Sequence, residues 1–207
     1  PVWEGLTWVL DLLHRPQMAI DVIHAYLAAH FWWMPDWRIN GLFDAMSLIR
    51  ASYLDTIHPR DTLLALTPQD FELLVALLFK RLRFSVSVTQ KTRDGGCDIK
   101  LISTTSGKAE SSVVECKRYA EKPIGVKDIR ALLGVVERDG ATRGLFVVTS
   151  KFTDPAVKEA SLTNRIELIG YEAFCVLLNE HFGPEWRANI DRILQEAHKE
   201  FDILLTK

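Results

Sequence analysis

The sequence is poor in cysteine and lacks a long apolar run, and each shortage excludes a class of protein. Its three cysteines, Cys97, Cys116 and Cys175, include no CxxC pair. The odd count and the spacing predict neither a disulfide framework nor a zinc site. The most apolar early stretch, AYLAAHFWWM, is short and contains His30, so no membrane span is predicted. No secretory signal pattern opens the chain, and we expect a reducing, cytoplasmic location.

A large net charge is also missing. The 207 residues carry a formal net charge of -2, with 48% hydrophobic and 25% charged residues, a composition typical of globular proteins. The charge is unevenly distributed, because residues 80–130 contain 12 Lys or Arg against 6 Asp or Glu, whereas residues 1–60 contain 4 against 6. A local positive excess is what a phosphate-binding face needs. The alternative is that these basic residues lie on ordinary solvated loops.

Residues 1–60 are predicted to form a helical region. Apolar residues recur at helical spacing over residues 3–14, 16–31 and 41–57, while residues 34–41 indicate a loop and residues 58–68 a linker. Five of the six tryptophans lie in this region, where they form either a helical core or a docking surface. Its four histidines lack the close spacing of a helical zinc motif. We therefore expect an interaction or accessory region without a metal site.

Residues 61–207 are predicted to form an α/β domain. A first helix has Thr67 as N-cap and Pro68 at its first position. Strands are predicted over residues 84–88, 97–103, 111–117, 143–150 and 165–170. Helices are predicted over 125–141, 154–161, 171–182 and from 184 onward, with Asp154 as one cap and with one apolar stripe formed by Val126, Ile129, Leu133 and Val136. This order predicts a mixed sheet flanked by helices.

The strand SSVVECK combines apolar residues with charge. Because side chains alternate between the faces of a strand, Val114 and Cys116 point one way while Glu115 and Lys117 point the other. Val114 and Cys116 suit the core. Cys116 is therefore interpreted as a small buried hydrophobe and not as a nucleophile.

A third charged residue, Asp98, begins the preceding predicted strand. If the two strands pair as a hairpin around TTSGKAE, Asp98 lies beside Glu115. Two carboxylates are ligands for Mg²⁺, which also takes phosphate oxygens. The ammonium of Lys117 can orient or help deprotonate a water and can neutralise developing charge. This set favours attack of water on a phosphodiester, and the alternative is a surface Glu–Lys pair with Asp98 in a turn.

Several longer blocks then carry a resemblance to a known family. They are PQDFELLVALLFKRLRFSVSVT, KTRDGGCDIKL, VVECKRYAEKPIGVKDIRALLGV and GATRGLFVVTSKFTDPAVKEA, which follow one another between Thr67 and Leu178. The chain over this span resembles the catalytic domain of the Mrr-like restriction endonucleases, within the PD-(D/E)xK nuclease superfamily. The resemblance implies a restriction-endonuclease-like core, a mixed sheet flanked by helices, at residues 61–207.

The resemblance also implies a catalytic set. The metal-dependent DNA-cleaving residues of the family correspond here to Asp98, Glu115 and Lys117, with the Cys116 carbonyl as a further metal ligand. Many members resemble Gln-Cys-Lys at the second block, whereas this chain has Glu-Cys-Lys, and Glu is the better metal ligand. Glu72, in the helical DFE, corresponds to a glutamate that often contributes to such sites, or is a solvated helix residue. The implied cofactor is Mg²⁺, for which Mn²⁺ is expected to substitute.

The expected function is that of a Mg²⁺-dependent endodeoxyribonuclease in restriction or anti-phage defence. The alternatives are a nuclease for RNA, DNA ends or branched junctions, and a nucleic-acid-binding module without cleavage. A homodimer is plausible because cutting both strands usually needs two sites. The helices of residues 1–60 are candidates for docking other domains or subunits.

Expected DNA contacts surround the catalytic set. Lys127 and Arg130 share a helix face and either contact phosphates or are ordinary solvated residues. Ser150 and Lys151 follow an apolar strand and either bind phosphate or cap the strand. The full set of expected contacts is Lys91, Arg93, Arg118, Lys127, Arg130, Ser150 and Lys151.

Overall fold

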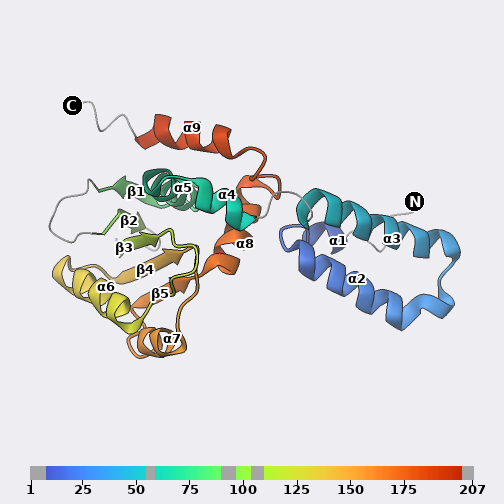
Figure 1. Ribbon diagram of the computed structural model, residues 1–207, viewed down its shortest axis with the longest axis horizontal. Coiled ribbons are helices and arrows are strands. Elements are labelled where there is room, and N and C mark those ends of the chain that lie inside the picture. The colour runs from blue at the N-terminus through green and yellow to red at the C-terminus, as the bar shows by residue number, and fades with distance from the viewer. Residues whose placement is uncertain (1–7, 55–58, 90–96, 104–109, 202–207) are drawn as a thin grey trace.

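The N-terminal part of the chain is a hairpin of helices. The computed structural model describes residues 8–54, 59–89, 97–103 and 110–201. Within the first range lie α1 (Trp8–Asp11), α2 (Pro16–His30), the 3-10 turn η1 (Phe31–Trp33), α3 (Asp36–Ile49) and the π-helical turn η2 (Arg50–Leu54) (Figure 1). The loop predicted over residues 34–41 is wrong beyond its first two residues. Helix α3 begins at Asp36, whose carboxylate suits the positive end of a helix dipole.

The hairpin has its own apolar core. Ile20 and Ile23 of α2 pack with Leu42 and Met46 of α3, and all four side chains are at most 5% exposed. The tryptophans at the hairpin tip do not contribute to it, because Trp32 and Trp33 are 87% and 89% exposed and Trp37 is 55% exposed. The prediction of a tryptophan core is therefore wrong for these three residues, and the alternative of a docking surface stays a prediction.

The segment between the hairpin and the sheet is a helix and not the predicted linker. Helix α4 covers Pro59–Ala65. Leu63 is fully buried and Leu66, which follows the helix, is 9% exposed, and both belong to the core on one face of the sheet. The segment is ordered because its apolar side chains pack against the α/β domain.

The α/β domain is built on a five-stranded sheet. Its strands are β1 (Ser85–Val88), β2 (Ile99–Ser103), β3 (Glu110–Lys117), β4 (Arg143–Val148) and β5 (Ile166–Ile169). They lie in sequence order, with β1, β2 and β3 antiparallel and with β3, β4 and β5 parallel. The predicted mixed sheet is confirmed, and β3 occupies its centre, where the antiparallel and parallel halves meet.

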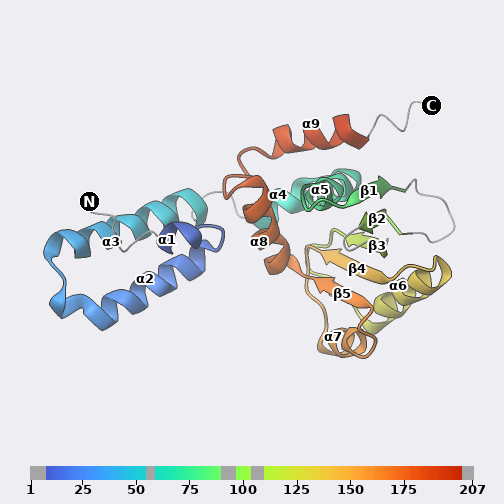
Figure 2. The same ribbon diagram turned by 180° about the vertical axis from the view of Figure 1, so that it is seen from behind.

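One face of the sheet is covered by α5 (Pro68–Arg81), with α8 (Tyr171–Phe182) and α9 (Ile190–Phe201) packed beside it (Figures 1 and 2). The predicted start of α5 is confirmed, because the Thr67 hydroxyl accepts a 3.0 Å hydrogen bond from the Asp70 N–H. From Leu73 to Phe79 every side chain of α5 is buried. A helix that is apolar on all sides is a core helix, and the sheet, α8 and α9 together bury this one.

The opposite face is covered by α6 (Val126–Arg138) and α7 (Asp154–Ser161). The buried residues of α6 are Ile129, Leu132 and Val136, so the predicted stripe is wrong in placing Leu133 in the core. The N-cap of α7 is Thr153 and not Asp154, because the Thr153 hydroxyl accepts from the Ala156 N–H.

A glycine on β4 permits the close approach of α6 to the sheet. A Cβ added at Gly144 would lie 2.7 Å from Cγ2 of Val136 and 3.0 Å from Cγ of Leu132. A larger residue would push α6 outward.

No single helix in the described part of the chain is long and apolar enough to cross a membrane. Helices α4 and α5 satisfy the length and composition criteria only as a pair, and a bend of 119° separates them.

Candidate active site

The antiparallel pairing of β2 with β3 brings two carboxylates together. Ile99 pairs with Val114, and the main-chain N–H of Asp98 donates a 3.0 Å hydrogen bond to the Val114 carbonyl. Asp98 therefore lies beside Glu115 at the end of the ladder, as the hairpin prediction required. The turn predicted around TTSGKAE falls mostly on residues 104–109, outside the described residues.

The Asp98 carboxylate is oriented by the main chain of β3. Its Oδ2 accepts a 2.7 Å hydrogen bond from the Cys116 N–H. The Cys116 side chain points into the core with Val114, and burial raises the pKa of its thiol well above the ordinary value. The thiol is thus protonated and inert, in agreement with the interpretation of Cys116 as a buried hydrophobe.

Glu115 and Lys117 form an ion pair on the same strand. Glu115 Oε1 lies 2.5 Å from Lys117 Nζ, and the two side chains are 20% and 31% exposed. Burial raises the pKa of Glu115, and the negative charges of Asp98 and Glu72 add to the rise, while the hydrogen bond from Lys117 opposes it. The site therefore holds more negative charge than its lysine neutralises.

The surrounding negative charges also raise the pKa of Lys117, and for an ammonium group this favours the charged form. Burial lowers the pKa of its ammonium, but the hydrogen bond to Glu115 and the charges of Glu115 and Asp98 outweigh burial, so the net shift is upward. Lys117 is accordingly a firmly protonated cation at neutral pH.

Glu72 lies on the first turns of α5 and is half-buried. Its charge raises the pKa of both Glu115 and Cys116, which places it within electrostatic range of the end of β3. Within the described ranges, however, no group of three His, Cys, Asp or Glu residues is arranged to hold a metal ion. The carboxylate donors aligned on neighbouring strands are Asp98 and Glu115.

The end of β4 lies next to this strand end. Lys117 pairs with Val148, and the Thr149 N–H donates a 3.2 Å hydrogen bond to the Lys117 carbonyl. The Thr149 hydroxyl donates to the Tyr119 carbonyl at 2.9 Å. Ser150 is 2% exposed, yet its Oγ has no hydrogen-bond partner among the described residues. A buried hydroxyl without a hydrogen-bond partner is unusual in folded proteins.

The predicted DNA-contacting residues have different environments. Arg118 donates a 2.6 Å hydrogen bond from Nη1 to the Leu64 carbonyl. Arg130 is held by Glu159 through bonds of 2.7 and 3.2 Å. Lys127 and Lys151 are exposed. Lys91 and Arg93 fall outside the described residues.

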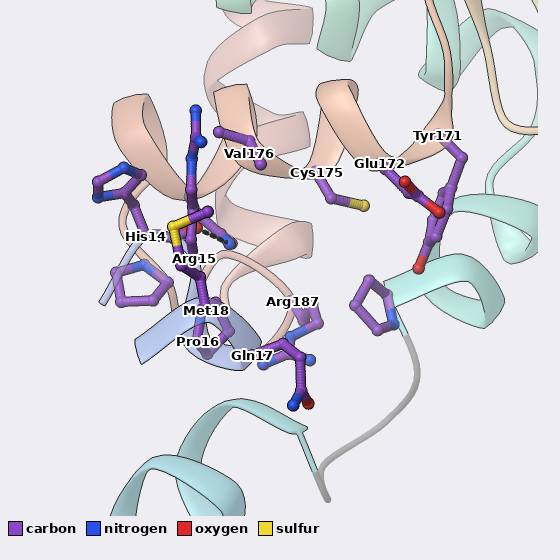
Figure 3. A pocket seen from close by; sticks show the side chains of 13 residues that line it. His14, Arg15, Pro16, Gln17, Met18, Tyr171, Glu172, Cys175, Val176 and Arg187 are labelled. Carbon is purple, nitrogen blue, oxygen red and sulfur yellow. Dashed lines mark hydrogen bonds between the residues drawn. The ribbon is translucent and has the colours of Figure 1, made fainter. Parts of the chain in front are cut away.

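A cavity of about 400 Å³ lies elsewhere, between the start of α2 and helix α8 (Figure 3). Pro16, Met18, Tyr171 and Cys175 are among its lining residues. Its lining includes none of the catalytic candidates, so it is separate from the strand-end site.

Comparisons with known proteins identify the α/β domain. The family of Mrr catalytic domains, described as restriction endonuclease, matches residues 63–178. The chain belongs to this restriction endonuclease family. The type IV methyl-directed restriction enzyme EcoKMrr of Escherichia coli K12 is 28% identical over 152 residues, which are 71% of this chain and 48% of that protein. The uncharacterized protein y4cE of Sinorhizobium fredii NGR234 is 33% identical over 89 residues, 42% of this chain and 23% of that protein.

A solved structure shares the restriction-endonuclease fold. The DNA modification-dependent restriction endonuclease AspBHI superposes with a TM-score of 0.53 at 20% identity, over 70% of this chain and 43% of that one. The chain spans less than half the length of the curated relatives it matches. The family and the fold predicted from the sequence are thus confirmed.

Proposed function

We propose that this chain is a metal-dependent endodeoxyribonuclease whose active site is the end of β3. The observation that carries the proposal is the juxtaposition of Asp98, Glu115 and Lys117 on paired strands within an Mrr-family domain. Membership of a restriction endonuclease family supports hydrolysis of DNA and a role in restriction or defence.

The donor chemistry of the site fits a hard divalent cation. Asp98 and Glu115 offer carboxylate oxygens, and Glu115 is an anion whose charge is disfavoured first by burial and then by the neighbouring carboxylates, a condition that a cation relieves. Mg²⁺ is usually bound through one or two carboxylates plus waters and substrate phosphates, so a closed protein cage is not required. Asp98 and Glu115 would hold it, with the Cys116 carbonyl, and Mn²⁺ is expected to substitute.

When bound there, Mg²⁺ would supply Lewis-acid stabilisation of the phosphodiester and a more acidic water. The protein residues would do the remaining work. Lys117 would orient the attacking water or assist its deprotonation, and would stabilise developing charge on phosphate oxygens. Glu115 fixes the Lys117 ammonium at 2.5 Å. Glu72 adds negative charge from α5, which strengthens cation binding.

Contacts with the DNA backbone would come from residues around the site. Lys127 and Lys151 are exposed cations, and the buried Ser150 hydroxyl has no partner among the described residues, which favours a ligand or water there. Arg130 and Arg118 are proposed contacts as well, although each already donates to a protein group. Lys91 and Arg93 complete the proposed set.

The test is nicking of supercoiled plasmid DNA by the wild type and by Lys117→Ala in Mg²⁺, Mn²⁺ and Ca²⁺. We expect cleavage by the wild type in Mg²⁺ or Mn²⁺, binding without turnover in Ca²⁺, and a loss of at least about 100-fold in the variant. Equal activity of the two proteins would contradict the proposal.

A substrate panel separates the remaining candidates. Methylated and unmethylated duplexes, DNA ends, branched junctions and RNA should be offered at equal concentration. Selective cleavage of RNA, ends or junctions would replace the endodeoxyribonuclease assignment. Tight DNA binding by folded protein with no cleavage of any substrate would indicate a binding module.

The helical hairpin is proposed as an interaction module for another domain or subunit. Trp32 and Trp33 are the most exposed large apolar side chains in the described part of the chain, which favours a docking role. A homodimer would bring two strand-end sites to one duplex. Deletion of residues 1–58, which keeps α4 and Arg60, tests separability: a truncated protein that stays soluble and cleaves DNA normally would assign the hairpin a separate role.

A further inference from the structure

Two arginines link α4 to the segment that follows β3. Arg118, next to Lys117, donates from Nη1 to the Leu64 carbonyl of α4 at 2.6 Å. Arg60, on the first turn of α4, donates from Nη2 to the Ala120 carbonyl. Each segment thus donates a hydrogen bond from an arginine to a main-chain carbonyl of the other. We refer to these two contacts as the reciprocal clamp.

The clamp acts where β3 leaves the sheet. Lys117 is the last residue of β3, and the chain then passes through Arg118, Tyr119 and Ala120 before reaching α6. On one side this segment is tied to β4, through the bonds from Thr149 to the Lys117 and Tyr119 carbonyls. On the other side it is tied to α4 by the clamp. The backbone that carries Lys117 is therefore fixed from both sides.

The arginines are suited to this task because they are partly removed from water. The Nε atoms of Arg60 and Arg118 are buried and have no hydrogen-bond partner among the described residues, so the Nη donors carry the polar contacts. The Arg60 guanidinium also lies 6.0 Å from the centre of the Tyr171 ring on α8, within cation–π range. The contact with Tyr171 connects the clamp to α8.

We propose that Arg60 and Arg118 are positioning residues, which act through the clamp to hold the Lys117 ammonium in place for the reaction. This inference rests on the proposed nuclease function. It is an alternative to the proposed contact between Arg118 and DNA, because the Arg118 guanidinium is already directed to the Leu64 carbonyl. A shift of about 1 Å in a catalytic group can lower the rate by about 100-fold, so loosening this backbone should affect turnover before substrate binding.

Arg81 provides a matched control. It joins α5 to other helices by a 2.8 Å hydrogen bond to the His181 carbonyl, by packing on the Phe182 ring at 4.3 Å and by hydrogen bonds of 3.1 and 2.9 Å to the Glu196 carboxylate. It belongs to no part of the proposed site. Arg81→Ala therefore reports what the loss of a structural arginine does by itself.

The experiment measures kcat, KM and DNA affinity for Arg118→Ala, Arg60→Ala, the double variant and Arg81→Ala. We expect kcat to fall by about tenfold or more in each single clamp variant, with KM and DNA affinity within about twofold of the wild type. The double variant should be little worse than either single variant, because the two contacts work as a unit. Arg118→Lys should recover part of kcat by donating to the Leu64 carbonyl.

A second readout does not need activity. The NMR signals of ¹³C-methylated lysines report the environment of each ammonium, and Lys117→Ala identifies the signal of Lys117. The clamp variants should shift or broaden that signal, and Arg81→Ala should leave it unchanged. Absence of cleavage by every protein, with this NMR pattern intact, would refute the proposed function and leave the positioning inference standing.

Three results would overturn the positioning role. The first is a Lys117 signal unaffected by both clamp variants. The second is an equal fall in kcat for Arg81→Ala, which would indicate general destabilisation. The third is a weaker DNA affinity of Arg118→Ala with kcat unchanged, which would make Arg118 a DNA contact.

Discussion

The main-chain N–H of Cys116 on β3 donates a 2.7 Å hydrogen bond to Oδ2 of Asp98, the residue before β2. The bond joins the second and third strands at the point where Glu115 and Lys117 also lie. It makes the orientation of Asp98 depend on the backbone of β3 and not on a rotatable side chain. Hydrogen bonds to an ionised acceptor are among the stronger ones in proteins.

The first prediction separates the charge of Asp98 from this hydrogen bond. Asp98→Asn keeps an oxygen that accepts from the Cys116 N–H but removes the negative charge. We expect normal folding and a loss of Mg²⁺-dependent cleavage of at least about 100-fold. Asp98→Ala should lose activity and also about 1–3 kcal/mol of unfolding free energy, because a part-buried donor is left unpaired. Urea unfolding and plasmid nicking on both variants measure the two effects.

The second prediction concerns the buried charge of Glu115. Burial and the neighbouring carboxylates raise its pKa, which makes the ionised form costly in the metal-free fold, and the hydrogen bond from Lys117 offsets part of that cost. In EDTA, Glu115→Gln should unfold at the same or a higher urea concentration than the wild type. Added Mn²⁺ should stabilise the wild type more than the variant, because only the wild type keeps both carboxylates. Equal stabilisation of the two proteins would argue against Glu115 as a metal ligand.

The third prediction tests the buried hydroxyl of Ser150. Removing a polar group that makes no hydrogen bond is neutral or stabilising, so Ser150→Ala should leave unfolding free energy unchanged or slightly higher. Thr149→Val is the matched control, because it removes the 2.9 Å bond to the Tyr119 carbonyl and should cost about 1 kcal/mol. If Ser150 binds phosphate, Ser150→Ala should also weaken DNA binding. An unchanged DNA affinity would leave the hydroxyl without a ligand role.

Local patterns predicted much of this domain correctly. The alternation of β3 placed Val114 and Cys116 in the core, and the cap signal located the start of α5 at Thr67. The pairing of Asp98 with Glu115 followed from strand order and a short hairpin connection. These features depend on neighbours in sequence, and periodicity and turn chemistry report on such neighbours.

Features that depend on distant packing were missed. The segment containing Leu63 was predicted to be a linker, although Pro59 is a favourable first helical residue. It is a helix because Leu63 and the following Leu66 pack into the core on the α5 side of the sheet. The reciprocal clamp joins residues 54 and 60 positions apart in sequence, and no local pattern marks either pair. In α6, Leu132 and not Leu133 is buried because the position of β4 decides which side of the helix faces inward.

The fourth prediction is a pH dependence of stability at the start of α5. Burial raises the pKa of Asp70, but hydrogen bonds from Thr67 and His198 outweigh burial, so the net shift is downward. Asp70 therefore contributes stability above its ordinary pKa, and this contribution is lost as pH falls through its lowered value. Asp70→Asn should be less stable than the wild type by about 0.5–1 kcal/mol near neutral pH. The difference should vanish in strong acid, and a difference independent of pH would contradict the assignment.

The fifth prediction compares two cations on α6 as DNA contacts. Lys127 is exposed, whereas Arg130 is held by two hydrogen bonds from its guanidinium to Glu159. Each phosphate contact contributes about 0.9 to the slope of log affinity against log salt. Lys127→Ala should therefore weaken DNA binding equally for all sequences and reduce that slope by about 1. Arg130→Ala should have a smaller effect, because binding would first have to displace Glu159. Glu159→Gln weakens this competition and should increase affinity if Arg130 reaches the DNA.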